Sequence, residues 1–299
     1  MSTEETWSVL RLLTWTTDYL KQHHAESPRL DAEVLLAEVL GCSRVDLYTR
    51  FDYEPTLEER VQFKAMIQER AAGKPVAYLV GKKEFYSLDF EVNENVLIPR
   101  PETEFLLMGL FDWAKTLPEG MEKAWKMADV GTGSGILAIT SAIHLKNSRV
   151  TAIDISPKAL EVARKNVEKY ASRLQNRVRL VQSDLFAALE TSEKGTFDAI
   201  LSNPPYVGRA EMGRELETNV CRYEPHVALF GGEKGTELIS RLLHQTSEFL
   251  RPGGRLFMEL SPMIHTEVVE MVKNVKSLEY LQTIRDLDRQ ERILVVEKK

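Results

Sequence analysis

The stretch MADVGTGSGI at residues 127–136 decides the fold of this chain. Residues 127–130 have the composition of a strand, three glycines follow, and an apolar helical pattern begins at Ile136. The glycines allow a tight turn and the close approach of a ligand. A dinucleotide fingerprint would place glycine or alanine at position 136, and no Lys-Ser/Thr pair follows as in a phosphate loop. Together with Asp154 at the end of the next strand, the stretch indicates an adenosine-containing cofactor more than a purely structural turn and a surface acid.

Strands and helices alternate from about residue 105 onward, which predicts an α/β fold with a mostly parallel sheet and helices on both faces. We expect strands at residues 127–130, 150–153, 178–181, 199–201 and 255–260. We expect helices at residues 136–145, 156–170 and 236–250, a turn at Pro252-Gly253-Gly254, and a long loop over 203–234. The tail should pair residues 280–284 with 292–296 as antiparallel strands, because the two segments are close in sequence.

Acidic residues follow the second and third of these strands. Asp154 can accept both ribose hydroxyls of an adenosine. Asp184 can accept from an adenine amino group while an apolar neighbour packs on the ring, although a helix-cap role fits Asp184 equally well. Ligands of open α/β sheets bind outside the carboxyl ends of the strands, so one site should gather these groups. The candidate cofactor-binding residues are Gly131, Thr132, Gly133, Ser134, Gly135, Asp154, Ile155, Asp184, Leu185 and Asn203.

Asn203-Pro204-Pro205-Tyr206 ends the fourth strand, because neither proline has an N–H to continue a ladder. The side-chain oxygen of Asn203 and the carbonyl of Pro204 offer two acceptors that can hold a planar –NH2 group. Tyr206 offers a flat face for stacking. Asn203, Pro204 and Tyr206 are the candidate catalytic residues, and with Pro205 and Arg100 they are the candidate substrate-binding residues. A plain Pro-Pro turn is the alternative for this stretch.

The region before the sheet predicts two further parts. Residues 5–72 carry apolar residues at helical spacing, with a stop at Gly41 and a new start at Pro55-Thr56. Residues 76–98 have strand-like composition, at 78–80, 85–86 and 90–92, and predict a hairpin linker. We expect a helical docking domain at 1–73, the linker at 74–98 and a catalytic domain at 99–299. Arg100, fixed between two prolines, is either a wall of the cleft or a solvated arginine.

Composition excludes several classes of protein. The chain of 299 residues is 43% hydrophobic and 28% charged, with a net charge of −6 and a pI near 5.7. An acidic total argues against a general nucleic-acid binder. No apolar run is long enough to span a bilayer, and the acidic start lacks the regions of a signal peptide. Cys42 and Cys221 lack a CxxC partner, which predicts reduced thiols and no metal. We expect a cytoplasmic, monomeric protein.

The chain resembles the class I S-adenosylmethionine-dependent methyltransferases that carry an Asn-Pro-Pro-Tyr motif, and within them it resembles the PrmC/HemK family over nearly its whole length. Besides residues 203–206, the resemblance rests on RLDAE at 29–33, GKPVAYL at 73–79, EFY at 84–86, LIPRPETE at 97–104, EP at 224–225 and ALF at 228–230. It implies a Rossmann-like seven-stranded sheet with an N-terminal helical bundle. It also implies S-adenosylmethionine as methyl donor, with S-adenosylhomocysteine as product.

The resemblance implies methylation of the side-chain amide nitrogen of the glutamine in the Gly-Gly-Gln motif of class 1 peptide chain release factors. Gly131 to Gly135 and Asp154 would hold the cofactor, Asp184 and Leu185 would line the adenine, and residues 203–206 would hold the glutamine. The chain departs from the family at Ser261 and Arg289, where glycine is usual. A ribosomal-protein glutamine methyltransferase, a nucleic-acid amino methyltransferase and an inactive cofactor-binding module are the alternatives.

Overall fold

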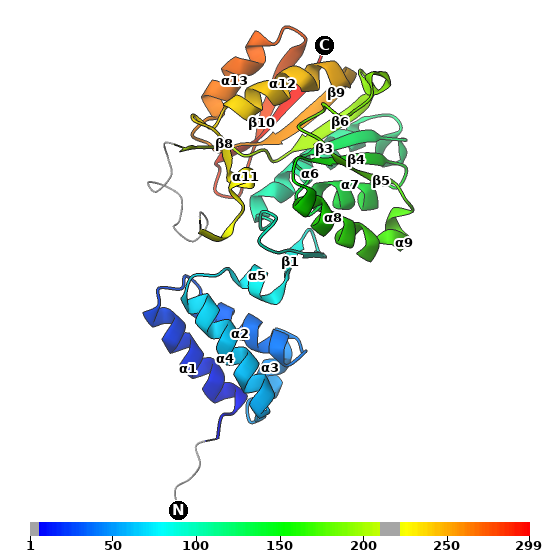
Figure 1. The fold of residues 1–299 in the computed structure, drawn as a ribbon. Coiled ribbons are helices and arrows are strands. Elements are labelled where there is room, and N and C mark those ends of the chain that lie inside the picture. Colours follow the sequence, from blue (N-terminus) through cyan, green and yellow to red (C-terminus); the bar gives the residue numbers. More distant parts are fainter. Residues whose placement is uncertain (1–5, 210–221) are drawn as a thin grey trace, which may run out of the picture. The chain divides into compact units, whose positions relative to one another are not determined.

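The computed structural model describes residues 6–209 and 222–299, and it divides into two compact units with their boundary between Lys82 and Lys83 (Figure 1). In the first unit, helix-capping residues set where the helices begin. Ser8 caps α1, while Ser43 and Thr56 form capping boxes with Asp46 and Glu59. The helices are α1 (Val9–Gln22), α2 (Pro28–Val39), α3 (Arg44–Thr49), α4 (Leu57–Ala71) and α5 (Val76–Val80). The predicted helical region and the start after Thr56 are confirmed.

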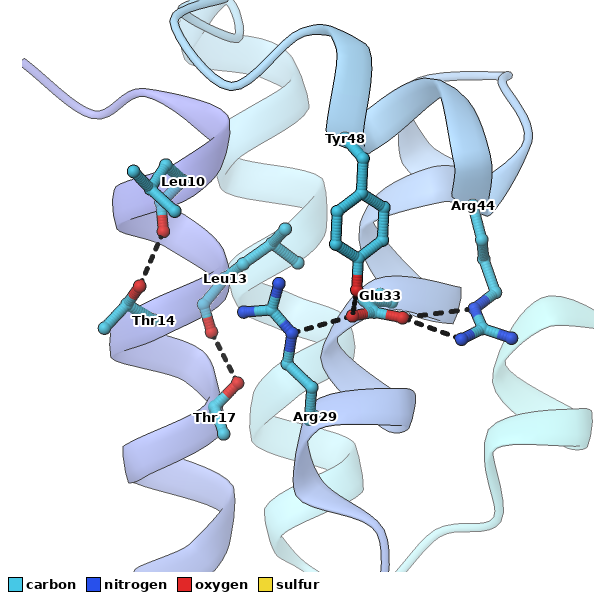
Figure 2. A network of polar contacts seen from close by, with 8 residues as sticks. All are labelled: Leu10, Leu13, Thr14, Thr17, Arg29, Glu33, Arg44 and Tyr48. Atoms are coloured by element: carbon cyan, nitrogen blue, oxygen red, sulfur yellow. Dashed lines mark hydrogen bonds and ion pairs between the residues drawn. The ribbon is translucent and has the colours of Figure 1, made fainter.

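A buried glutamate connects α2 to α3 inside this unit (Figure 2). The side chain of Glu33 is 2% exposed, and its two oxygens accept from Arg29, Arg44 and Tyr48. The Nε of Arg29 lies 2.7 Å from Oε1, and Nη2 of Arg44 lies 2.7 Å from Oε2. Burial alone would raise the pKa of Glu33, but these hydrogen bonds outweigh it and lower the pKa. The network therefore supports the fold while Glu33 is ionised.

The segment predicted as three strands contains one helix and one hairpin. Residues 78–80 belong to α5, so the strand predicted there is wrong. Pro75 precedes this short helix and Gly81 ends it in the left-handed region, and these two residues outweigh the β preference of a five-residue segment. The predicted hairpin is present as β1 (Lys82–Phe85) and β2 (Leu88–Glu91). Phe85, Leu88 and Phe90 pack in the core of the second unit.

A seven-stranded sheet organises the second unit, with strand order β10-β11-β9-β6-β3-β4-β5. Strand β11 is antiparallel to β9 and β10, and the other neighbours are parallel. The strands are β3 (Lys126–Val130), β4 (Arg149–Asp154), β5 (Val178–Gln182), β6 (Phe197–Ser202), β9 (Leu250–Glu259), β10 (Leu278–Arg285) and β11 (Glu291–Lys298). The α/β fold class and the antiparallel tail are confirmed. Strand order changes direction at β3, and such a switch point opens a crevice at the carboxyl ends of the strands.

Helices cover both faces of the sheet (Figure 1). Alternate strand residues pack with α6 and α7 on one face and with α12 and α13 on the other. The helices are α6 (Glu104–Thr116), α7 (Ile136–His144), α8 (Pro157–Lys169), α9 (Ala171–Leu174), α11 (His226–Leu229), α12 (Glu237–Phe249) and α13 (His265–Asn274). A short 3-10 helix, η1 (Pro101–Thr103), precedes α6. Helix α13 was not predicted.

Three other sequence expectations have different outcomes. Strand β9 runs through Pro252-Gly253-Gly254, where a turn was expected, with an irregularity in its pairing to β6. The expected loop over 203–234 contains β7 (Val207–Gly208), α11 and β8 (Phe230–Gly232), and its residues 210–221 lie outside the described part. Cys42 is a half-buried free thiol, and Cys221 lies outside the described residues.

Ser261 and Arg289, the two positions where the chain departs from the family pattern, differ in backbone conformation. Arg289 has φ +62°, in the left-handed region where glycine is favoured, and it lies in the turn between β10 and β11. Ser261 is not among the residues with positive φ. The glycine expected at position 289 therefore has a conformational reason.

Candidate functional site

A cavity of about 830 Å³ lies at the carboxyl ends of the parallel strands, within the second unit. Each of the four predicted strand ends contributes to its lining: Gly131 after β3, Asp154 at the end of β4, Asp184 after β5 and Asn203 after β6. The volume is in the range of small-molecule binding sites. The structure thus brings the four separately predicted groups together around one space.

The glycine-rich turn is held by backbone hydrogen bonds to β4. The N–H groups of Gly131 and Thr132 both donate to the carbonyl of Ile153 at 2.9 Å. Gly131, Gly133 and Gly135 have positive φ values of 78°, 55° and 87°, which favour glycine. A Cβ on Gly133 would have no protein atom within 4 Å, so the backbone here faces open space. The turn therefore exposes main chain to the cavity.

Asp129 accepts hydrogen bonds from this turn and from the helix that follows it. Its Oδ2 accepts from Thr132 Oγ1 at 2.6 Å and from the N–H of Ala138 at 3.1 Å. The side chain is buried, and Oδ1 has no hydrogen-bond partner among the described residues. Burial raises the pKa of Asp129 to about 7, against the opposing effect of these two hydrogen bonds. Asp129 connects β3, the turn and the start of α7.

Asp154 also accepts a hydrogen bond from the turn. Its Oδ2 accepts from the N–H of Gly133 and its Oδ1 from the N–H of Ser156, both at 2.9 Å. Burial raises the pKa of Asp154, while these backbone hydrogen bonds lower it. A carboxylate oxygen can accept more than one hydrogen bond, so both oxygens of Asp154 retain capacity for a ligand. Asp154 can both fix the glycine turn and accept ligand hydroxyls.

The remaining predicted cofactor residues line the same cavity. Ile155 is 52% exposed, and Leu185 is buried with φ +51°. Asp184 forms an ion pair with Arg241 of α12, with 2.7 Å between Oδ2 and Nη2. This arginine was not predicted, because it lies 57 positions from Asp184 in the sequence. Asp184 therefore faces the cavity with one of its oxygens already paired.

Asn203 lines the cavity with its amide oriented by a threonine. Its Nδ2 donates to Oγ1 of Thr103 at 3.3 Å. Since the nitrogen faces Thr103, Oδ1 is the amide group left to accept from a ligand. Pro205 also lines the cavity, whereas Pro204 and Tyr206 are not among the lining residues. The ring of Tyr206 packs beside the cluster formed with α12 and α13, and its stacking role stays a prediction.

Two glycines allow the Asn-Pro-Pro-Tyr segment to pack closely against the segment around β8. A Cβ on Gly231 would lie 2.3 Å from the carbonyl oxygen of Pro205, and one on Gly235 would lie 2.3 Å from that of Tyr206. Both distances are far below contact, so any side chain would displace the segment. Strand β7 pairs with β8 directly after Tyr206. Gly231 and Gly235 were not predicted, although their spacing within residues 231–235 could have drawn attention to them.

Arg100 forms part of the cavity wall and is paired to Glu224. Its Nη2 lies 2.5 Å from Oε1 of Glu224, whose side chain is 2% exposed. Oε2 of Glu224 accepts from the N–H of Ile98 at 3.4 Å. Of the two expectations for Arg100, a place in the wall of the cleft fits this geometry.

Comparison with known proteins agrees with this site. A family model described as PrmC N-terminal domain matches residues 11–81, and one described as methyltransferase small domain matches residues 112–223. A release factor glutamine methyltransferase from Rhodopirellula baltica is 46% identical over 99% of this chain and 98% of its own length. The chain belongs to the release factor glutamine methyltransferase family. A second member, from Koribacter versatilis, is 40% identical over 91% of this chain and 92% of its own length.

Solved structures support the fold of this family member. A methyltransferase from Pyrococcus furiosus matches with a TM-score of 0.50 and 22% identity, over 79% of this chain and 97% of that one. The Thermus thermophilus 16S rRNA N2 G1207 methyltransferase, solved with AdoMet and guanosine, matches with a TM-score of 0.51 and 20% identity. It covers 73% of this chain and 50% of that one. Such distant matches carry the Rossmann-like methyltransferase fold and no substrate.

An adenosyl cofactor fits the residues of this family member. The open backbone at Gly133, the carboxylate of Asp154 and the apolar Ile155 and Leu185 suit a ribose and a purine. The Oδ1 atom of Asp129 is buried without a hydrogen-bond partner among the described residues, but Asp129 does not line the cavity.

Sequence reasoning missed three groups at this site: Thr103, Glu224 and Glu259. It assigned no role to Thr103 or Glu224, although both lie in quoted motifs. Glu259 is the last residue of β9, so the rule that led to Asp154 and Asn203 could have found it.

Proposed function

We propose that this protein transfers a methyl group from S-adenosylmethionine to the side-chain amide nitrogen of the glutamine in the Gly-Gly-Gln motif of class 1 peptide chain release factors. The observation that carries the proposal is the position of Asn203. Its amide lines the same cavity as the glycine turn and Asp154, with Nδ2 turned to Thr103. Membership of the release factor glutamine methyltransferase family supports the choice of substrate.

The proposed cofactor-binding residues are those of the glycine turn together with Asp154, Ile155, Asp184 and Leu185. When bound, S-adenosylmethionine supplies an electrophilic methyl group and leaves as S-adenosylhomocysteine. Asp154 would accept the ribose hydroxyls, and the turn would allow close approach of the backbone at Gly131 and Gly133. The apolar side chains of Ile155 and Leu185 would pack on the adenine.

The proposed catalytic residues act by holding the glutamine amide. An amide nitrogen is a weak nucleophile because its lone pair is delocalised into the carbonyl. Asn203 Oδ1 and the Pro204 carbonyl would accept its two N–H groups, so that the lone pair faces the cofactor side of the cavity. The same two acceptors stabilise the positive charge that develops on the nitrogen. Positioning of this kind can contribute up to about 7–11 kcal/mol. The nitrogen then loses its extra proton to solvent water, because an N-alkylated amide cation is acidic enough to need no dedicated base.

We also propose that the helical N-terminal domain docks the release factor. An aromatic stripe follows α1: Trp7 just before the helix, Trp15 and Tyr19 within it and His23 at its C-cap contact one another in that order. Trp15 stacks on Tyr19 with 5.0 Å between ring centroids and is 47% exposed. Exposed tryptophan and tyrosine often supply the binding energy of protein interfaces. A glutamine side chain offers few atoms for binding, so contacts remote from the cavity must supply much of the affinity.

The test is incubation of the purified protein with labelled S-adenosylmethionine and an intact class 1 release factor, followed by mass spectrometry. We expect one added methyl on the glutamine of Gly-Gly-Gln and none after Gln→Ala substitution in the release factor. A short Gly-Gly-Gln peptide should react much more slowly, and duplex DNA and bulk RNA should yield no product. Label on a ribosomal protein, on adenine or on cytosine in place of the release factor would refute the proposal.

A further inference from the structure

Glu259 and Asn203 leave adjacent strands at the same edge of the sheet. Strands β6 and β9 are parallel neighbours, and Ser202 pairs with Met258 in their register. The next residue of β6 is Asn203, and the next residue of β9 is Glu259. Thr103, at the end of η1, contacts both side chains. Three residues far apart in the sequence therefore meet at the cavity wall, where Asn203 and Thr103 are lining residues and Glu259 is not.

The contacts form a chain that runs from the core to the cavity. Asn203 Nδ2 donates to Thr103 Oγ1 at 3.3 Å. The Thr103 hydroxyl also acts on the Glu259 carboxyl as a hydrogen-bond donor, which lowers the pKa of that carboxyl against the larger effect of burial. Thr103 is 1% exposed and Glu259 is 2% exposed. The second oxygen of Glu259, Oε2, is buried and has no hydrogen-bond partner in the described part of the chain. Such a carboxyl is costly to bury, and a well-packed apolar residue would be no worse for stability, so its presence calls for a function.

The direction of this chain decides which end of the Asn203 amide faces the substrate. A threonine hydroxyl both donates and accepts, so Thr103 alone would tolerate either orientation of the amide. An ionised carboxylate only accepts, and it therefore takes the single proton of the Thr103 hydroxyl. Thr103 is then left as an acceptor, which bonds to Nδ2 and leaves Oδ1 for the substrate.

We propose that Glu259 and Thr103 are positioning residues that fix the orientation of the Asn203 amide, so that Oδ1 accepts from the substrate –NH2 group. A flipped amide would present its own N–H groups to those of the glutamine and could not hold them. This inference deepens the proposed function and rests on it for the turnover measurements. Neither positioning residue touches the reacting atoms.

The charge on Glu259 determines whether the chain of hydrogen bonds has this direction. Burial raises its pKa to about 7, opposed by the hydrogen bond from Thr103. The charged and titratable groups that face it are Arg292 of β11, Glu102 of η1, Arg100 and Tyr206. A protonated Glu259 could donate to Thr103, whose hydroxyl could then donate to Asn203 Oδ1 and stabilise the flipped amide. Turnover should therefore fall as the pH drops through about 7.

Three variants separate positioning from packing. Thr103→Val is nearly isosteric and removes the hydroxyl, so we expect kcat to fall at least about tenfold, or roughly 1.4 kcal/mol of barrier, with cofactor affinity unchanged. Thr103→Ser keeps the hydroxyl and should restore turnover to near the wild-type level. Glu259→Gln can present either its oxygen or its –NH2 to Thr103, so kcat should fall and its acidic limb should disappear. Equal kcat in wild type and Thr103→Val, or an unchanged pH profile in Glu259→Gln, would overturn the proposal.

A measurement on the protein without substrate keeps this test independent of the proposed function. In asparagine-15N-labelled protein, the Asn203 side-chain signals, assigned through Asn203→Ala, should shift with a midpoint near pH 7. Glu259→Gln should abolish that shift, which also excludes Asp129 as its origin. Asn203 signals that titrate equally in both proteins, or in neither, would contradict the proposed link between Glu259 and the Asn203 amide. A wild-type enzyme that fails to methylate release factor would refute the proposed function. The titration would still show whether Glu259 controls the orientation of the Asn203 amide.

Discussion

Arg100 and Glu224 form an ion pair across 124 positions of the sequence, with 2.5 Å between Nη2 and Oε1. The glutamate is buried, and its other oxygen accepts from the backbone of Ile98. The pair joins the segment before α6 to the segment before α11. It thereby fixes one wall of the cavity that contains Asn203.

A double-mutant cycle measures this connection. We expect Arg100→Ala and Glu224→Ala to couple by about 1–3 kcal/mol in the free energy of unfolding, because either single change leaves a buried or half-buried charge without its partner. The matched control is the exposed pair Lys115 and Asp112, whose side chains are 63% and 71% exposed. Its coupling should stay below about 1 kcal/mol. Equal coupling in the two pairs would mean that the Arg100 pair contributes no more than a surface contact.

Asp154→Ala should weaken the binding of S-adenosylmethionine at least tenfold. The change removes a carboxylate that would accept ribose hydroxyls and that also holds Gly133 at 2.9 Å. Loss of one charge-assisted partner typically costs about 1.5–3 kcal/mol. Calorimetric titration gives the dissociation constant, with Glu161→Ala on the exposed face of α8 as the control. An unchanged constant for Asp154→Ala would refute the ribose assignment.

Much of this fold could be predicted because strands of a parallel sheet leave clear local signals. Apolar runs marked the central strands, glycine marked the turn after β3, and the two prolines after Asn203 marked the end of β6. The strand-end rule then placed Asp154, Asp184 and Asn203 around one cavity without any knowledge of the contacts. These statements depend on short stretches of sequence and on one geometric rule.

The contacts that complete the site could not be predicted in this way. The Arg100–Glu224 and Asp184–Arg241 pairs join residues 124 and 57 positions apart, and no local pattern links them. The strand predicted at 78–80 was wrong for a different, local reason. The β-like composition of the segment was outweighed by Pro75 and Gly81 at its ends, and the segment forms α5. The place of Tyr206 beside the substrate stays a prediction from its chemistry: it does not line the cavity, and it packs against the core cluster that includes residues of α12 and α13.

Asn203→Ala should lower turnover by orders of magnitude and leave cofactor affinity nearly intact. Its amide is proposed to hold the substrate nitrogen, so the loss should appear in kcat and not in the cofactor dissociation constant. Single-turnover kinetics with saturating release factor measure this, and Asn274→Ala at the exposed end of α13 is the control. A decrease of less than about tenfold, or roughly 1.4 kcal/mol of barrier, would rule out the positioning mechanism.

Trp15→Ala should raise KM for an intact release factor by about fivefold or more, the effect of losing at least 1 kcal/mol at an interface hot spot. Trp15 is 47% exposed in the aromatic stripe of α1, so its removal should leave the helical core intact. Turnover of a short Gly-Gly-Gln peptide should not change, because a peptide cannot reach a remote docking surface. Val61→Ala on α4, where Val61 is 61% exposed, serves as the control. If Trp15→Ala and Val61→Ala have the same KM as wild type, the docking role of this stripe is wrong.

Glu259→Gln should make the protein more stable at pH 8 while it slows turnover. The folded-state pKa of Glu259 is about 7, above its ordinary value of 4.5, so the folded state holds this proton more tightly than the unfolded state. The protein must then lose stability from this group as the pH rises from about 4.5 to 7, and the loss is complete above that range. At about 1.4 kcal/mol per pKa unit, the full effect is on the order of 3 kcal/mol.

Glutamine carries no charge to bury, so the variant should match wild type near pH 5 and exceed its melting temperature by several degrees at pH 8. Calorimetry at both pH values measures this, with the exposed Glu279→Gln as control. A wild-type protein at least as stable as Glu259→Gln at pH 8 would show that the Glu259 carboxylate is compensated in the folded state.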